Sequence, residues 1–307
     1  MSIHPQAKGV VEDPRPRRTP LTGQREAPTR LRGALSKVTS SPIGAVGAAL
    51  GLAILLLCFV GPLVYSTNQT DVDTLNSFLP PSSDHWLGTD AQGFDVLGRL
   101  MEGGQVSLQI GLLAALVATV IGTLYGAISG LAGGVVDAVM MRFVDVMMSI
   151  PFLFIVLIVS TKYSSTMVSL SITLGLFSWL IPARLVRGEV LTLRSRDYVL
   201  AARSMGASRT RLVLTHLVPN ALGVVVVNIT FQVADAILAI ATLGFLGFGL
   251  RYPDTDWGGQ LSNGVTYLLS GYWWLIYPVG ICLVAVVLAF NLLGEALRDA
   301  LDRRRTS

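Results

Sequence analysis

A single carboxylate in the middle of a long apolar run is the clearest candidate for chemistry in this chain. Asp235 lies within the run 219–246. Polar residues three and seven places before it and seven places after it share its face on a helix, and these are Gln232, Asn228 and Thr242. The stripe is either a polar seam bonded to neighbouring helices or the wall of a hydrated pathway. We favour the pathway, because an ionisable group within a membrane normally faces the bundle interior or water.

A second polar group lies in a loop and could suggest a metal site. It comprises Asp84, His85, Asp90 and Asp95. The spacing matches no ligand pattern of zinc or calcium sites. The surrounding sequence LGTDAQGFDVLGRL favours turn and cap chemistry. A surface for an external protein is the other interpretation left open, and we expect no metal on this chain.

The motifs of common catalytic sites are absent from the sequence. Its three lysines, Lys8, Lys37 and Lys162, do not follow a glycine, so it has no GxxxxGK[ST] phosphate loop. The HExxH, GxSxG and paired-cysteine motifs are absent as well. Cys58 and Cys282 lie in apolar runs and are typical packing residues. We therefore expect a protein that is not an enzyme and binds no cofactor.

The composition predicts that these residues are positioned by membrane-spanning helices. Of the 307 residues only 14% are charged, and the mean hydropathy is +0.61. Runs near the length that crosses a bilayer occur at 43–65, 106–131, 135–160, 167–186, 219–246 and 273–293. In lipid each span must satisfy its own backbone groups, so the fold class is an all-α polytopic membrane protein with six transmembrane helices.

The distribution of basic residues predicts the orientation of these spans. Of 23 lysines and arginines, only Arg99, Lys162 and Arg251 fall on the side away from the two tails. Since positive loops remain in the cytoplasm, both termini should be cytoplasmic. The net charge of +4 then needs no nucleic-acid partner.

The domain organisation follows from these spans. We expect a disordered basic cytoplasmic tail at 1–42, a first transmembrane helix at 43–65 and an extracytoplasmic loop at 66–105. A five-helix core at 106–294 would include a cytoplasmic loop at 187–218, and 295–307 would be a cytoplasmic tail.

Several local features of the spans carry expectations of their own. The glycines Gly122, Gly126 and Gly130 recur every four residues, which lets another helix approach closely. Pro151 should kink the third span, and Arg142 and Asp145 can pair as i, i+3 neighbours. Pro219 disfavours helix at Val218 and should separate the loop 187–218 from the fifth span.

The loop 187–218 is expected to contain a short helix. Ser195 is a plausible N-cap and Gly206 a natural terminator, which places the helix at 196–205. Ser208 can cap a second helix that runs toward Thr215. Residues at i, i+3, i+4 and i+7 of the first helix form a face of small side chains between two larger ones, namely Tyr198, Ala201, Ala202 and Met205. This face suits insertion into a groove of a partner, whereas the arginines nearby suit an amphipathic helix on the membrane surface. Spacing alone leaves both open.

The same loop resembles the permease subunits of ATP-binding-cassette importers, in particular the second permease type of the dipeptide and oligopeptide branch. The family signature is Glu-Ala-Ala, three residues, Gly, and nine residues to Ile-x-Leu-Pro. It is matched here at Ala201, Ala202, Gly206 and Pro219. Leu200 replaces the Glu, His216 the Ile and Val218 the Leu. Further similarity covers LGTDAQGFDV, VDAVMMRFVDV, TLGFLGFG, WGGQL and AFNLLGEALRDALD, with Phe94 where the family usually has Arg.

The resemblance implies a heteromeric importer in a bacterial inner or plasma membrane. This chain would pair with a second homologous permease, and an extracytoplasmic binding protein would deliver the substrate. Two cytoplasmic ATPases, or one fused ATPase, would bind ATP and Mg²⁺. The short helix would be a coupling helix between the fourth and fifth transmembrane helices, contacting an ATPase through Tyr198, Ala201, Ala202, Arg203, Met205, Gly206 and Ala207. Binding-protein docking is assigned to Asp90, Asp95 and Trp257.

Peptides are the substrate that this resemblance implies first, with metal chelates, haem or other small solutes as alternatives in the same importer class. A different class, an autonomous secondary transporter or channel, would require broken helices or inverted repeats around a midplane site. The sequence contains no convincing internal repeat.

Overall fold

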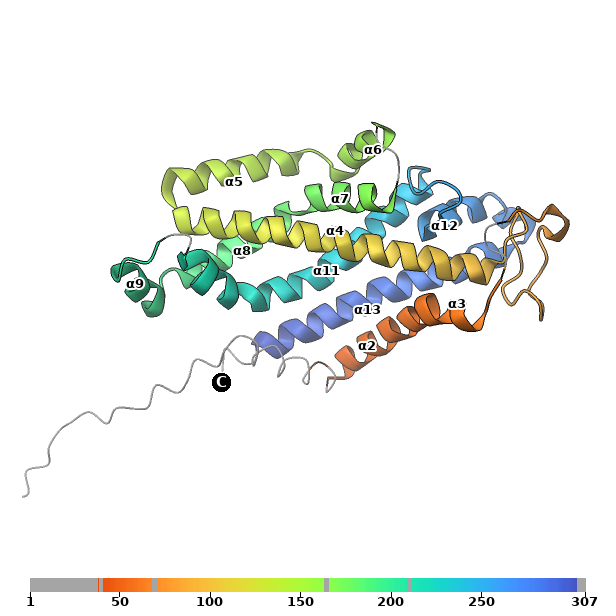
Figure 1. Cartoon of the computed structure of the whole chain (residues 1–307), viewed down its shortest axis with the longest axis horizontal. Helices are drawn as coiled ribbons and strands as arrows, with labels where there is room; N and C mark the ends of the chain where they lie inside the picture. The colour runs from red at the N-terminus through yellow and green to blue at the C-terminus, as the bar shows by residue number, and fades with distance from the viewer. Residues whose placement is uncertain (1–37, 39–40, 68–70, 163–165, 209–210, 303–307) are drawn as a thin grey trace, which may run out of the picture.

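The protein is an elongated bundle of long helices (Figure 1). This computed structural model describes residues 38, 41–67, 71–162, 166–208 and 211–302. Most of the expected N-terminal tail 1–42, and the end of the expected C-terminal tail at 303–307, lie outside the described residues. Across the described ranges every regular element is a helix, which confirms the predicted all-α class.

Four segments are long and apolar enough to cross a membrane unaided. α2 (Pro42–Leu55) continues through the π-helical turn η1 (Leu56–Val60) into α3 (Gly61–Val64). α4 (Val96–Ala132), α11 (Val218–Phe245) and α13 (Tyr277–Asp302) are the others. Two bent helix pairs raise the number of spans to as many as six if each pair counts as one.

The bent pairs correspond to the third and fourth predicted spans. α5 (Gly134–Ser149) and α6 (Phe152–Lys162) meet at 77°, so Pro151 ends one helix and begins another rather than only kinking the span. α7 (Met167–Ser178) and α8 (Leu180–Leu193) meet at 44°. Pro182, in the first turn of α8, has no N–H to offer the Ser178 carbonyl, which explains why the helix changes direction there.

The expected break before Pro219 is wrong. Val218 has helical dihedral angles, φ −59° and ψ −48°, and Pro219 lies in the first turn of α11. The π-helical turn η3 (Leu212–Leu217) directly precedes α11. A π turn shifts the hydrogen-bond pattern from i→i+4 to i→i+5, so the missing N–H and the proline ring are accommodated without ending the helix.

α4 is the central element of the bundle and packs against α8, α11 and α7. Its glycines fit the backbone of α8 directly, because a Cβ atom on Gly126 would lie 2.3 Å from the Ala183 carbonyl oxygen. The predicted close helix approach is therefore confirmed. α13 packs between α11 and α2.

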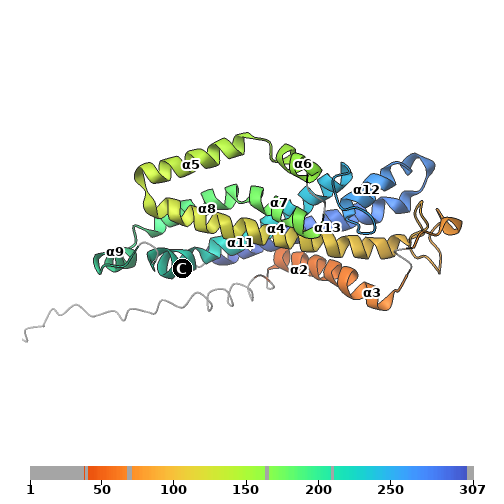
Figure 2. The ribbon, with the colours of Figure 1, turned by 45° about the horizontal axis from the view of Figure 1, so that its top comes forward.

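Two opposite ends of the bundle carry the candidate sites. The short helix α9 (Asp197–Ser204) projects at one end, called here the α9 end. The opposite end, called the loop end, carries the segment 71–95 and α12 (Trp257–Val265) (Figure 1). Figure 2 shows α5 and α6 along one edge of the bundle, with α2 and α3 along the other.

Candidate coupling helix and translocation face

The short helix α9 forms close to its predicted position. The backbone N–H groups of Val199 and Leu200 donate to the Arg196 carbonyl at 2.9 and 3.1 Å, so the chain enters the helix at Arg196. The Ser195 hydroxyl instead donates to the Thr192 carbonyl at 2.9 Å, and Ser195 is not the N-cap. At the other end Gly206 has φ +83°, the left-handed conformation expected of a terminating glycine. Ser208 Oγ accepts from the Arg211 N–H at 3.3 Å, as predicted for a cap of the second helix.

The structure divides the predicted coupling residues between two faces of α9. Ala202 is buried and Tyr198 is half-buried, and both belong with Val199 to one buried cluster that also includes residues of α8 and η3. Ala201 is exposed, as are Leu200 at 47% and Met205 at 81%. Gly206 is exposed and Ala207 half-buried, while the Arg203 side chain lies outside the described part of the chain. One face therefore anchors the helix, and an adjacent apolar face points away from the bundle.

Polar side chains join α8 and the residue that follows it to α4 and α5. Arg194 donates to the Gly130 carbonyl oxygen at 3.0 Å, which ties the end of α8 to α4. The Asp145 carboxylate accepts a hydrogen bond from Arg184 on α8. The predicted pairing of Asp145 with Arg142 is thus wrong, because the packing of α5 against α8 places a guanidinium from another helix on the carboxylate.

The polar stripe of α11 also separates into two parts. Gln232 is 5% exposed, and its Nε2 donates to the Ser178 carbonyl at 3.0 Å. This is the carbonyl that Pro182 cannot bond, so Gln232 repairs the α7–α8 bend. Asn228 is half-buried, and its Oδ1 accepts no hydrogen bond from the described residues. Gln232 therefore fits the seam interpretation, whereas Asn228 shows no bond from its Oδ1 to a neighbouring helix.

The other two stripe residues lie on the open face of α11. Asp235 and Thr242 are exposed, and they share that face with Leu238 and Phe245 at helical spacing. The opposite face, which includes Ile237 and Ile240, is fully buried. The Asp235 carboxylate is therefore available to whatever covers the open face, whether water, solute or another subunit.

At the loop end, Asp95 is a structural residue rather than a surface residue. It is 1% exposed and caps α4 by accepting from the Gly98 N–H at 2.8 Å. Its other oxygen accepts from the Tyr65 hydroxyl at 2.8 Å and lies 2.9 Å from His85 Nδ1. Direct docking by Asp95 does not fit this burial.

Asp90, by contrast, is half-buried in a turn. Its Oδ1 accepts from the N–H groups of Gln92 and Phe94, each at 2.9 Å. Burial raises the pKa of its carboxyl, and those backbone donors oppose the rise. The turn and cap chemistry predicted for this loop is confirmed.

Trp257 is also structural. It is completely buried, and its indole Nε1 donates to the Leu100 carbonyl at 2.9 Å. This burial does not fit direct docking by Trp257, because the side chain packs α12 against α4. The sequence offered no signal that separates a buried from an exposed tryptophan at this position.

Asp256 is a site residue that sequence reasoning missed. It is 1% exposed and accepts from the Gly259 N–H at 2.9 Å and the Leu250 N–H at 3.0 Å. A Cβ atom on Gly244 would lie 2.1 Å from its Oδ1, so glycine is needed there. Burial raises the pKa of the Asp256 carboxyl, and the backbone donors oppose that rise. The TLGFLGFG and WGGQL segments thus form one packed unit around this carboxylate.

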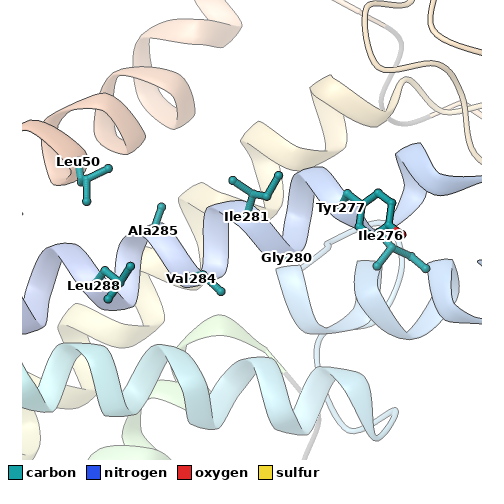
Figure 3. A pocket seen from close by; sticks show the side chains of 8 residues that line it. All are labelled: Leu50, Ile276, Tyr277, Gly280, Ile281, Val284, Ala285 and Leu288. Atoms are coloured by element: carbon teal, nitrogen blue, oxygen red, sulfur yellow. The ribbon is translucent and has the colours of Figure 1, made fainter.

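A shallow groove of about 390 Å³ runs between α2 and α13 (Figure 3). Its lining is aliphatic apart from Tyr277, and it includes Leu50, Ile281, Val284 and Leu288. No charged group lines it. Such a surface suits hydrocarbon better than a hydrophilic solute.

Comparison with known proteins gives one consistent result. A family model described as "Binding-protein-dependent transport system inner membrane component" matches residues 122–307. The chain is 37% identical over 259 residues to a dipeptide transport system permease protein of Bacillus subtilis (strain 168), across 83% of this chain and 81% of the relative. It is 40% identical over 259 residues to an oligopeptide transport system permease protein of Escherichia coli (strain K12), across 83% and 85%. A relative of that oligopeptide type in Mycobacterium bovis is 39% identical over 263 residues, across 83% and 89%.

Proposed function

The chain belongs to the family of binding-protein-dependent transport system inner membrane components, and we propose that it is one permease subunit of an ATP-driven importer for dipeptides or oligopeptides. With a second homologous permease it would form the translocation pathway. The observation that carries this proposal is the burial pattern of α9: its inner face is buried in the bundle, while Leu200 and Met205 are exposed. A helix held firmly by one face and open on the other suits transmission of force from a partner.

The open face of α9 would insert into a groove of a cytoplasmic ATPase. Val199 and Ala202 hold the helix on α8 and η3, so movement of the partner would be passed to the membrane helices. Gly206 and Ala207 would allow the close turn that follows, and Tyr198 would support the helix from its side. Two separate ATPases or one fused ATPase would bind ATP and Mg²⁺, while this chain would bind no cofactor.

The open face of α11 would border the pathway. Asp235 and Thr242 are exposed on it, Asn228 is half-buried, and Gln232 would stabilise the helices behind it. Transport would proceed by alternating access: ATP binds one state of the complex more tightly, and this differential affinity shifts the helices between outward and inward arrangements.

A binding protein would dock on the loop end. Asp90 remains a candidate contact, while Asp95 and Trp257 would support the docking surface from beneath. Exposed apolar side chains at this end include Trp86 at 62% and Tyr252 at 61%, and such groups are typical of contact surfaces. The loop end would face the cell exterior, and the α9 end and both termini would face the cytoplasm.

The domain borders follow from this orientation. The tail 1–42 would be cytoplasmic, 43–65 the first span and 66–105 the external loop. The core 106–294, with the coupling loop 187–218, would carry the pathway, and 295–307 would be a cytoplasmic tail.

Reconstitution tests the proposal. The chain, its partner permease, the ATPases and the binding protein are assembled in proteoliposomes with ATP inside, and uptake of labelled dipeptides and oligopeptides is measured. We expect uptake that requires ATP and the binding protein. Uptake by this chain alone would contradict the importer. ATP-dependent uptake of a metal chelate or haem, but not of peptide, would contradict the substrate class.

A further inference from the structure

A bidentate ion pair joins the start of α5 to the middle of α8. Arg187 donates to the Asp137 carboxylate through Nε at 2.5 Å and through Nη2 at 2.6 Å. The Ser129 hydroxyl, near the end of α4, donates to the same carboxylate at 2.5 Å. Only 11% of the Asp137 side chain is exposed. Two helices thus hold this carboxylate in a geometry that fixes orientation as well as distance.

Arg187 lies where the backbones of α8 and α4 are in direct contact. A Cβ atom on Gly126 would lie 2.9 Å from the Arg187 backbone nitrogen, and one on Gly130 would lie 3.1 Å from its carbonyl oxygen. The glycines therefore let the backbones of α4 and α8 lie in close contact at Arg187. The Arg187 side chain accordingly projects from a firmly packed part of the bundle.

The same part of α8 carries α9. Val186 and Val190, which flank Arg187 in sequence, share one buried cluster with Val199 and Ala202 of α9. Close-packed side chains transmit displacement because they leave few voids. This shared cluster is the route by which a force on α9 would reach α8 beside Arg187.

α5 is held to the bundle by few buried groups. Asp137 and Val144 are its only buried residues, and its outward face is apolar and exposed, as at Val139 and Phe143. The chain turns by 77° after α5, so no straight continuation steadies the helix. Figure 2 shows α5 at the edge of the bundle. The Asp137–Arg187 pair holds the start of α5, while the packing of Val144, the bond from the Tyr125 hydroxyl to the Met140 carbonyl at 2.9 Å and the Asp145–Arg184 pair hold the rest of the helix.

We propose that the Asp137–Arg187 pair makes α5 move together with α8 and α9, and that both are positioning residues for the coupling of ATP hydrolysis to transport. This inference rests on the proposed function, in which an ATPase moves α9. Displacement would pass from α9 through the valine cluster to α8, and across the ion pair to α5. Without the pair, α8 would move while α5 lagged behind.

The first test measures coupling in the assembled complex. Asp137→Asn and Arg187→Gln are each reconstituted with the partner subunits, and ATPase rates are measured with and without loaded binding protein. We expect the stimulated-to-basal ratio and the uptake per ATP to fall at least about fivefold, the lower end of typical coupling between sites. The charge exchange Asp137→Arg with Arg187→Asp should restore part of the ratio.

The chain offers a matched control on the same two helices. The Asp145–Arg184 pair is about half exposed on both sides, so Asp145→Asn should change the ratio little. An unchanged ratio in both Asp137→Asn and Arg187→Gln would overturn the inference, even if less complex assembled, because that is the result of a purely structural role. A wild-type complex without stimulation would instead contradict the proposed function.

A distance measurement tests the inference without a charge variant. Spin labels at Val139→Cys on α5 and Ser204→Cys on α9, both at exposed positions, are placed in a complex in which the two native cysteines are replaced. We expect the label-to-label distance to stay the same with and without ATP. A distance that changes between these states would overturn the proposal.

Discussion

Replacing Met205 by alanine is the sharpest test of the proposed coupling face. The Met205 side chain is 81% exposed, so truncating it should leave the stability of this chain unchanged. Complete burial of a methionine contributes about 1.5–3 kcal/mol. If an ATPase groove covers the exposed part, and alanine retains the Cβ atom, the loss of association free energy is about 1–2 kcal/mol, or roughly 5–30-fold in the dissociation constant.

The assay is a titration of the ATPase subunits onto the permease pair in nanodiscs, with thermal unfolding of the pair measured in parallel. Leu269→Ala is a matched control, because Leu269 is fully exposed at the loop end. Val199→Ala is the converse control: Val199 is 2% exposed, and its truncation should lower stability. Unaltered ATPase affinity in Met205→Ala, or a loss of its stability, would refute the assignment of this face.

Three further predictions concern the membrane helices. In a background without the native cysteines, Asp235→Cys should react with a water-soluble thiol reagent while Gln232→Cys stays protected; equal protection of both would contradict the pathway. Gln232→Leu should lower the free energy of unfolding by about 1–3 kcal/mol, because the Ser178 carbonyl loses its donor. An unchanged free energy of unfolding would show that the bend does not depend on this hydrogen bond. Trp257→Phe should also lower the free energy of unfolding by about 1–3 kcal/mol, because it removes the hydrogen bond to Leu100 and leaves a small cavity. Increased binding-protein affinity without destabilisation would contradict the buried role of Trp257.

The C-terminal end of α9 could be predicted because the determining chemistry is local, whereas the predicted N-cap at Ser195 was wrong. A glycine at the place where the helix must stop adopts φ +83°, and left-handed backbone costs glycine little. Ser208 caps the next helix for a similarly local reason. The apolar spans and the all-α class also depend on composition within one segment, so sequence was sufficient for them.

The orientation of α9 could not be predicted in the same way. Spacing placed Ala201 and Ala202 on one face, but Ala202 is buried and Ala201 is exposed. The decisive residue is Val199, which lies in a buried cluster with residues of η3 and α8. Which side of a short helix turns inward depends on neighbours distant in the chain, and the periodicity of eight residues does not determine it.

The partners of charged and polar side chains were likewise decided at long range. Asp145 bonds to Arg184 and not to the nearer Arg142, and Gln232 reaches the carbonyl exposed by Pro182. For Asp145 the sequence offered a nearby arginine, Arg142, that is not the partner. For Gln232 the sequence contained no sign that the Ser178 carbonyl would need a donor. The effect of Pro219 was predicted wrongly for a related reason: it follows a π turn that could not be predicted from the sequence.

The chemistry of the proposed coupling face follows from Leu200. The resemblance places an acid at this position in the family, whereas Leu200 here is 47% exposed beside Ala201 and Met205. An acid on that face would attract a basic residue of a partner, but these three side chains offer only apolar area. A groove that covers these side chains gains binding free energy by removing their apolar area from water. A cation placed against Leu200 would lose its hydration without a compensating charge or hydrogen bond. If α9 is the coupling helix we propose, we therefore expect the ATPase groove to be apolar where it covers Leu200.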